Sequence, residues 1–252
     1  MQKGPAMAAP TKTDSYGYGY GGYKGSRSPV AEAFRVLRTN LQFAAVDKEL
    51  KVILVTSASP NEGKSTVVQY LAQTISQTGK KVMALDADLI NPTLHGRFGI
   101  PNQRGLSNLI VGDADFTVFT RLKEYPNLSV ITSGPIPPNS SELLGSARMK
   151  HVMDRLREEY DVVVVDSPPI LPVTDAVVVS SLADGVILVV QAGHTRSGEV
   201  HHAQEVLEAA HANLLGVVLN RARRSVNDYY YTRTYGTSGR EPAKSEEVPA
   251  ES

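Results

Sequence analysis

The chain contains no cysteine. Disulfide bridges, thiolate zinc sites and iron–sulfur clusters are therefore excluded. Charge of one sign is also missing, because 26 Lys and Arg residues balance 26 Asp and Glu residues to a formal net charge of +0. A neutral chain is a poor candidate for holding nucleic acid or anionic lipid by bulk charge. We therefore expect no nucleic-acid partner.

Long hydrophobic runs are lacking as well. No apolar run approaches the ~20 residues that a membrane helix needs. The longest, Val162–Val165 and Val186–Val190, have the length of strands. The first 15 residues lack the apolar centre of a secretory signal. We predict a cytoplasmic protein that reaches the membrane only through a partner.

What the sequence does have is enough apolar material for a core, with 41% hydrophobic residues in 252. We predict one folded domain over residues 29–221. The flanking segments 1–28 and 222–252 are rich in Gly, Ser, Pro or charge and poor in aliphatic residues, so we predict that both are disordered tails. Eight of the 11 tyrosines nevertheless lie in these tails. An ordinary globular protein would keep most of them in its folded part.

Between the tails, short apolar runs alternate with segments of helical periodicity. This pattern predicts an α/β fold, with a mostly parallel central sheet buried on both faces and helices on both faces. The predicted strands are 52–55, 82–85, 128–131, 162–165, 186–190 and 215–219. The predicted helices are 30–45, 65–78, 140–160, 174–183 and 197–210.

A phosphate-binding loop follows the first predicted strand. Residues 57–66 read Ser-Ala-Ser-Pro-Asn-Glu-Gly-Lys-Ser-Thr and match G-x-x-x-x-G-K-[ST] except at Ala58. Such a loop aims backbone N–H groups and a helix N-terminus at phosphate oxygens. Lys64 would reach the β- and γ-phosphates and the Ser65 hydroxyl would ligate Mg²⁺. The predicted nucleotide-binding residues are Asn61, Glu62, Gly63, Lys64, Ser65 and Thr66.

Acidic residues end two further predicted strands. Asp86 and Asp88 follow the second strand, and Asp166 follows the fourth. A lone Asp after a strand is more often a turn or capping residue. Three of them at the carboxyl edge of a parallel sheet, beside a phosphate loop, favour a site for Mg²⁺ and ATP. We predict that Ser65, Asp86 and Asp166 bind the metal, and that the chain is a P-loop NTPase.

Together, the Lys64 loop, the Asp86/Asp88 pair and the strand end Asp166-Ser167-Pro168-Pro169 resemble the bacterial tyrosine kinases of capsule and exopolysaccharide synthesis. Their family carries Walker A, Walker A′ and Walker B motifs. The resemblance implies transfer of phosphate from ATP to protein tyrosine. It assigns Asp86 as the group that accepts the tyrosine proton, with Lys64, Asp88 and Asp166 completing the catalytic set.

A helix ahead of the first strand carries Glu32-x-x-Arg35-x-x-Arg38, which is similar to the self-association motif of this family. The spacing keeps Glu32, Arg35 and Arg38 on one broad helical face, where they could pair with a second subunit. The resemblance therefore implies a homo-oligomer, in the form of a ring. The alternative is an ordinary solvated charged face.

The tyrosines of the second tail resemble the C-terminal autophosphorylation cluster of the family. They are Tyr229, Tyr230, Tyr231 and Tyr235. The resemblance implies phosphorylation in trans, a transmembrane activator of the polysaccharide co-polymerase type, and a kinase peripheral to the inner face of the membrane. The alternative for a tyrosine-rich tail is adhesive low complexity.

Two positions depart from the family pattern. Asn61 replaces the first glycine of P-G-E-G-K, which the turn can accept because Asn tolerates positive φ. Ile90 stands where the Walker A′ pattern D-x-D-x-R has Arg. These two departures, Asn61 and Ile90, keep open a second function, a regulatory ATPase switch or scaffold with little tyrosine phosphotransfer. Ser59 stands at the loop position where partition ATPases of this fold carry an additional lysine, which disfavours the interpretation of this chain as a partition ATPase. Asn220, at the end of the last predicted strand, is a candidate contact for adenine.

Overall fold

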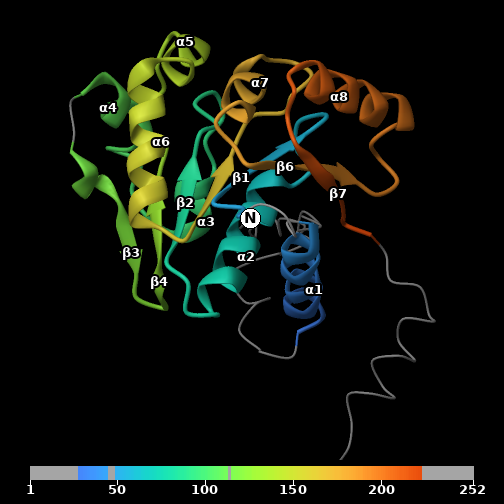
Figure 1. Cartoon of the computed structure of the whole chain (residues 1–252), viewed down its shortest axis with the longest axis horizontal. Helices are drawn as coiled ribbons and strands as arrows, with labels where there is room; N and C mark the ends of the chain where they lie inside the picture. The colour runs from blue at the N-terminus through green and yellow to red at the C-terminus, as the bar shows by residue number, and fades with distance from the viewer. Residues whose placement is uncertain (1–27, 45–48, 113–114, 223–252) are drawn as a thin grey trace, which may run out of the picture.

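The computed structural model describes residues 28–44, 49–112 and 115–222. Its centre is a seven-stranded sheet of order β3-β4-β2-β5-β1-β6-β7 (Figure 1). Every pairing is parallel except that of β3 with β4. The strands are β1 Val52–Ser57, β2 Val82–Asp86, β3 Thr120–Leu122, β4 Tyr125–Ile131, β5 Val162–Asp166, β6 Gly185–Gln191 and β7 Leu214–Asn220.

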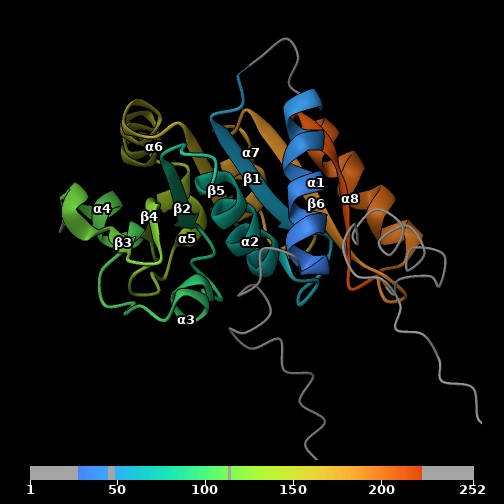
Figure 2. The same ribbon diagram turned by 90° about the horizontal axis from the view of Figure 1, so that it is seen from below.

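Helices cover both faces of the sheet, so the predicted architecture is confirmed. One face carries α1 Pro29–Ala44, α2 Lys64–Ser76 and α3 Leu94–Phe98. The other carries α4 Leu106–Val111, α5 Ser140–Leu144, α6 Ala147–Glu159, α7 Asp175–Ser180 and α8 Ser197–Ala209, with a 3₁₀ turn at Phe116–Val118. Figure 2 shows α1 lying alongside α2 on its face.

Side chains that alternate along each strand pack into two separate hydrophobic cores, one on each face of the sheet. In β1, Ile53 and Val55 pack with α2, whereas Val52 and Leu54 pack with the helices of the opposite face. Successive side chains of a strand point to opposite faces, so a sheet covered on both sides needs apolar residues at every position. This explains why the central strands read as unbroken Val, Ile and Leu runs.

The predicted helix 140–160 is wrong in one respect, because it is two helices. The first ends at Leu144, and Gly145 and Ser146 separate it from the second. The Ser146 hydroxyl oxygen accepts a hydrogen bond from the backbone N–H of Met149 at 3.2 Å. That bond satisfies one of the free N–H groups with which a helix begins, so it fixes the start of α6.

Strand β3 and helices α3 and α4 were not among the predicted elements. They have three, five and six residues, and segments this short carry little periodic pattern. Within the described ranges, no helix combines the length and the apolar character needed to cross a membrane. The two predicted tails fall almost entirely outside the described residues.

Candidate active site

The loop between β1 and α2 has the backbone of a phosphate-binding turn. Asn61 has φ 64° and Gly63 has φ 97°, so two of its residues are left-handed. The prediction that Asn61 accepts positive φ is confirmed. A Cβ at Gly63 would lie 2.0 Å from Nδ2 of Asn220, so glycine is required there for space as well as for conformation.

Helix α2 starts at Lys64, and its first two residues, Lys64 and Ser65, are buried, with 7% and 9% of their surface exposed. Gly63 precedes the helix without a side-chain cap. The first N–H groups of α2 therefore have no capping side chain and can donate to an anion. This is the geometry in which the predicted residues Asn61 to Thr66 would bind phosphate.

The side chain of Glu62 braces this loop from within. It is fully buried, and its carboxylate accepts hydrogen bonds from the backbone N–H of Ser59 at 2.9 Å and from the Thr195 hydroxyl. Only the backbone of Glu62 is left to serve the predicted phosphate contact. Thr195 lies 133 residues away in sequence and has no motif of its own, so sequence reasoning missed it.

Asn220 also holds the loop. Its Nδ2 donates to the carbonyl oxygen of Glu62 at 2.8 Å, and its Oδ1 accepts from the backbone N–H of Arg221 at 2.9 Å. Both polar ends of the side chain are engaged inside the protein. The suggested contact of Asn220 with adenine stays a prediction.

The two acidic strand ends meet across the sheet. Strand β5 lies between β1 and β2, and Asp86 and Asp166 are directly paired in the parallel register. Both carboxylates are fully buried at the same edge as the phosphate loop. The fold therefore brings the acids of two predicted motifs beside Lys64 and Ser65.

Two backbone N–H groups hold the carboxylate of Asp86. Its carboxylate accepts from the N–H groups of Asp88 at 3.2 Å and Leu94 at 3.1 Å. Burial raises the pKa of Asp86 well above its usual value, and the negative charge of Asp166 raises it further. Asp86 thus has a higher proton affinity than an ordinary carboxylate.

Burial also raises the pKa of Asp166, to about 7, although the Lys64 charge and the nearby Ser65 hydroxyl favour its charged form. Neither carboxylate oxygen of Asp166 has a hydrogen-bond partner of normal geometry within the described chain. Two buried, unsatisfied oxygens are costly unless something binds them. A divalent cation with its water shell would supply the missing partners.

The donor set fits Mg²⁺ bound together with a nucleotide. Carboxylate and hydroxyl oxygens are hard ligands, and Mg²⁺ is commonly bound through one or two carboxylates together with phosphates and water. No group of three or more His, Asp or Glu residues among the described residues is arranged to hold a metal alone. The site therefore suits a metal that arrives with phosphate oxygens.

Arg97 on α3 is a further cation at this edge that the sequence did not reveal. Burial lowers its pKa, and the charge of Asp166 opposes that shift. Its Nε is buried without a hydrogen-bond partner in the described part of the chain. The segment around Arg97 carries no motif and was not predicted as a helix, which is why the residue was missed.

The predicted self-association motif lies apart from this site, on α1. Glu32 and Arg35 form an ion pair within the helix, and Nη1 of Arg38 donates to the carbonyl oxygen of Thr74 on α2 at 3.4 Å. Arg38 thus contributes to packing inside the subunit. The predicted acceptors Tyr229, Tyr230, Tyr231 and Tyr235 lie outside the described residues.

The chain is similar to proteins whose family is known. Residues 50–213 match the family described as AAA domain. The chain is 40% identical over 207 residues to tyrosine-protein kinase YwqD of Bacillus subtilis (strain 168), covering 82% of this chain and 86% of that protein. It is 37% identical to the putative tyrosine-protein kinase CapB of Staphylococcus aureus, covering 81% and 90%.

A solved structure is similar as well. The crystal structure of the chimerical protein CapA2B2 superposes with a TM-score of 0.77 at 39% identity, covering 80% of this chain and 88% of that one. The septum site-determining protein MinD from Pyrococcus horikoshii shares the fold at 23% identity and a TM-score of 0.58. The predicted fold and enzyme class are thereby confirmed, and the chain belongs to the bacterial tyrosine-protein kinase family.

Proposed function

We propose that this chain transfers the γ-phosphoryl group of ATP to the C-terminal tyrosines of a second copy of itself, and so regulates capsular or exopolysaccharide synthesis and export. The acceptors are Tyr229, Tyr230, Tyr231 and Tyr235. The observation that carries the proposal is the buried Asp86–Asp166 pair beside the phosphate-loop Lys64, in which burial raises the pKa of both carboxyl groups.

In the proposed reaction, the tyrosine oxygen attacks the γ-phosphorus as the bond to the β,γ-bridging oxygen breaks. The phenol proton passes to the carboxylate of Asp86, and ADP leaves. A phenol has a pKa near 10, so a carboxylate accepts its proton only as the new bond forms. Because the pKa of Asp86 is raised, it lies closer to the pKa of the phenol than that of an ordinary carboxylate does. Most of the catalysis is positioning and charge neutralisation.

The residues of this chain would divide the work. Lys64 and the N–H groups of the loop bind and orient the β- and γ-phosphates. Ser65, Asp86 and Asp166 are the proposed metal-binding side chains, with Asp88 positioning the loop next to them. Mg²⁺, when bound with ATP, neutralises charge on the phosphates.

The proposed assembly is a homo-oligomeric ring, formed with the help of Glu32, Arg35 and Arg38, in which the tail of one subunit enters the site of its neighbour. A transmembrane activator of the polysaccharide co-polymerase type would hold the ring at the inner face of the membrane. Phosphorylation adds about two negative charges per tyrosine near pH 7. The electrostatic repulsion between phosphorylated tails would then dissociate the ring into smaller species.

Intact mass after incubation with Mg·ATP tests this function. Wild type is compared with Lys64→Met and with a variant in which the four tail tyrosines are Phe. We expect phosphates on wild type and none on either variant. Loss in the Lys64 variant alone would point to the tyrosines of the first tail, Tyr16, Tyr18, Tyr20 and Tyr23, as the acceptors. Equal oligomer sizes for phosphorylated and unphosphorylated protein would contradict the dissolution of the ring.

One observation favours a second function, a regulatory ATPase that transfers little phosphate to tyrosine. Ile90 is 36% exposed in the position where the family pattern has an arginine. If that arginine matters for transfer, this chain would bind nucleotide without modifying tyrosine. ATP binding with no added phosphate, even in the presence of the membrane partner, would favour this second function.

A further inference from the structure

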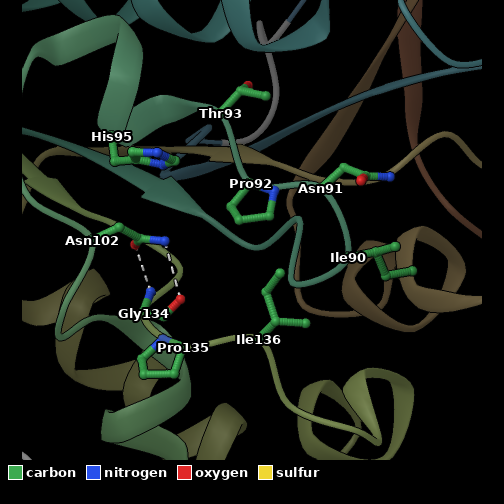
Figure 3. Close-up of a pocket in the computed structure, with 9 residues that line it drawn as sticks. All are labelled: Ile90, Asn91, Pro92, Thr93, His95, Asn102, Gly134, Pro135 and Ile136. Atoms are coloured by element: carbon green, nitrogen blue, oxygen red, sulfur yellow. Dashed lines mark hydrogen bonds between the residues drawn. The ribbon is translucent and has the colours of Figure 1, made fainter.

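A pocket of about 480 Å³ opens beside the loop that carries Asp88, outside the residues proposed to bind nucleotide or metal. Figure 3 shows its walls, with the loop after β2 facing the loop after β4. Its volume falls within the range typical of binding sites for small groups. Its main lining residues are Ile90, Pro92, His95, Asn102, Pro135 and Ile136.

The wall after β4 is held in a fixed shape. Asn102 Nδ2 donates to the carbonyl oxygen of Gly134 at 3.1 Å, and the N–H of Gly134 donates back to Asn102 Oδ1 at 2.9 Å. Gly134 has φ 74°, and a Cβ there would lie 2.7 Å from the Ser107 hydroxyl. The wall that presents Ile136 is therefore preformed rather than created by a ligand.

The opposite wall is tied to the candidate catalytic carboxylates. Asp88 Oδ1 accepts from the N–H groups of Ile90 at 3.3 Å and Asn91 at 2.8 Å. Asp86 Oδ2 accepts from the N–H of Leu94 at 3.1 Å. A group that binds against Ile90 therefore contacts the same loop that hydrogen-bonds to Asp86, the proposed proton acceptor.

The residues that line the pocket favour an uncharged, apolar or aromatic group. It contains no Lys, Arg, Asp or Glu, and His95 is its one titratable residue. Ile90 and Ile136 expose 36% and 63% of their surface around its mouth. Burial of an apolar or aromatic group would be favourable here, whereas a charged group would lose water and meet no opposite charge.

We propose that this pocket holds the aromatic side chain next to the tyrosine that is being phosphorylated, and that the occupant is the Tyr229–Tyr231 segment of a second copy. The inference rests on the proposed kinase function. In that segment every neighbour of Tyr230 is another tyrosine, and adjacent Cα atoms are about 3.8 Å apart. A tyrosine at Asp86 therefore brings a neighbouring ring to the same edge of the sheet.

The pocket then determines which tyrosines are modified. A neighbour that already carries phosphate has about two negative charges, for which the lining offers no lysine or arginine. Adjacent tyrosines would accordingly be poor substrates once one of them is phosphorylated. Acceptors flanked by neutral aromatic residues are preferred.

The test uses the full chain, Mg·ATP and synthetic peptides of residues 226–235 in which Tyr230 is the single acceptor and Tyr235→Phe is constant. Positions 229 and 231 are both Phe, both Lys or both Glu. Each peptide is assayed with wild type, with Ile136→Glu and with Val111→Glu, which changes an exposed residue of α4 that does not line the pocket.

Wild type and Val111→Glu should favour the Phe peptide by about tenfold in kcat/KM, as expected for one apolar group in a pocket. Ile136→Glu should raise the KM of the Phe peptide by a similar factor, leave kcat and the affinity for ATP unchanged, and shift the preference to the Lys peptide. Unchanged ranking in Ile136→Glu would overturn the pocket assignment while leaving the kinase function intact.

Binding of the fluorescein-labelled Phe peptide, measured by anisotropy, separates the two proposals. If binding is weakened by Ile136→Glu but not by Val111→Glu, the pocket is supported even when no peptide is phosphorylated, and the kinase proposal alone fails. If Ile136→Glu binds the peptide as well as wild type does, the pocket assignment is wrong.

Discussion

At the scale of single residues, buried carboxyl groups dominate the site. Asp166 has a pKa raised to about 7 by burial, so the folded state binds its proton more tightly than the unfolded chain does. Its contribution to stability is present at low pH and is lost as the pH rises from about 4 through 7. Without nucleotide, the protein carries a destabilising charge above neutral pH.

The variant Asp166→Asn removes that charge while keeping the size of the side chain. We expect the Tm of the nucleotide-free variant to exceed that of wild type, with a gap that widens from pH 4 to pH 7 and is constant above. The gain above neutral pH should be a few kcal/mol. Thermal unfolding at a series of pH values measures it, with the surface variant Asp154→Asn as control. A gap independent of pH would contradict the assigned cause.

Gly63 offers a second test, because it combines left-handed backbone with lack of space. Gly63→Ala should lower the affinity for ATP at least tenfold and destabilise the protein by more than about 1 kcal/mol. Gly79 is a matched control, since it has φ 89° but a Cβ added there would meet nothing within 4 Å. Gly79→Ala should show the loss of stability alone. Equal ATP affinity in both variants, measured by calorimetry, would mean that the contact with Asn220 is unimportant.

At the scale of elements, the sequence predicted the buried strands and most helices but missed β3, α3 and α4. The buried strands and α2 were predictable because their periodicity and the phosphate-loop spacing point the same way. The break after Leu144 was not, since helical spacing continues across Gly145 and one glycine does not end a helix. The bond from Thr195 to Glu62 joins residues far apart in sequence, and no local pattern encodes such a contact.

The start of α6 can be tested at Ser146. Ser146→Ala removes the acceptor for the N–H of Met149 and should cost about 1 kcal/mol of unfolding free energy. Chemical denaturation measures the change. Ser181→Ala, directly after α7, is the comparison, because the Ser181 hydroxyl donates to the carbonyl oxygen of Val178 in the preceding helix rather than capping the start of one. A smaller effect at Ser146 than at Ser181 would argue against the cap.

At the scale of the whole molecule, the question is whether the α1 motif joins subunits. Exchanging its charges with Glu32→Arg and Arg35→Glu keeps the ion pair within the helix but inverts what a neighbour would meet. If the motif forms the proposed ring, the particle mass should fall to that of smaller species, with Tm nearly unchanged. Sedimentation velocity reports the mass. The same mass as wild type would make the motif an ordinary solvated face.

The bond between Asn220 and Glu62 also fixes the point from which the chain continues toward its last tyrosines. Tyr229 follows nine residues after Asn220 and Tyr235 follows 15. A chain spans at most about 3.3–3.6 Å per residue, so their reach from this anchor is limited to roughly 30 and 50 Å. The length of the chain after Asn220 therefore limits how far from its own subunit a tyrosine can be phosphorylated. In an assembly where Asn220 of one copy lies farther than that length from Asp86 of the next copy, the acceptor tyrosines could not reach the active site.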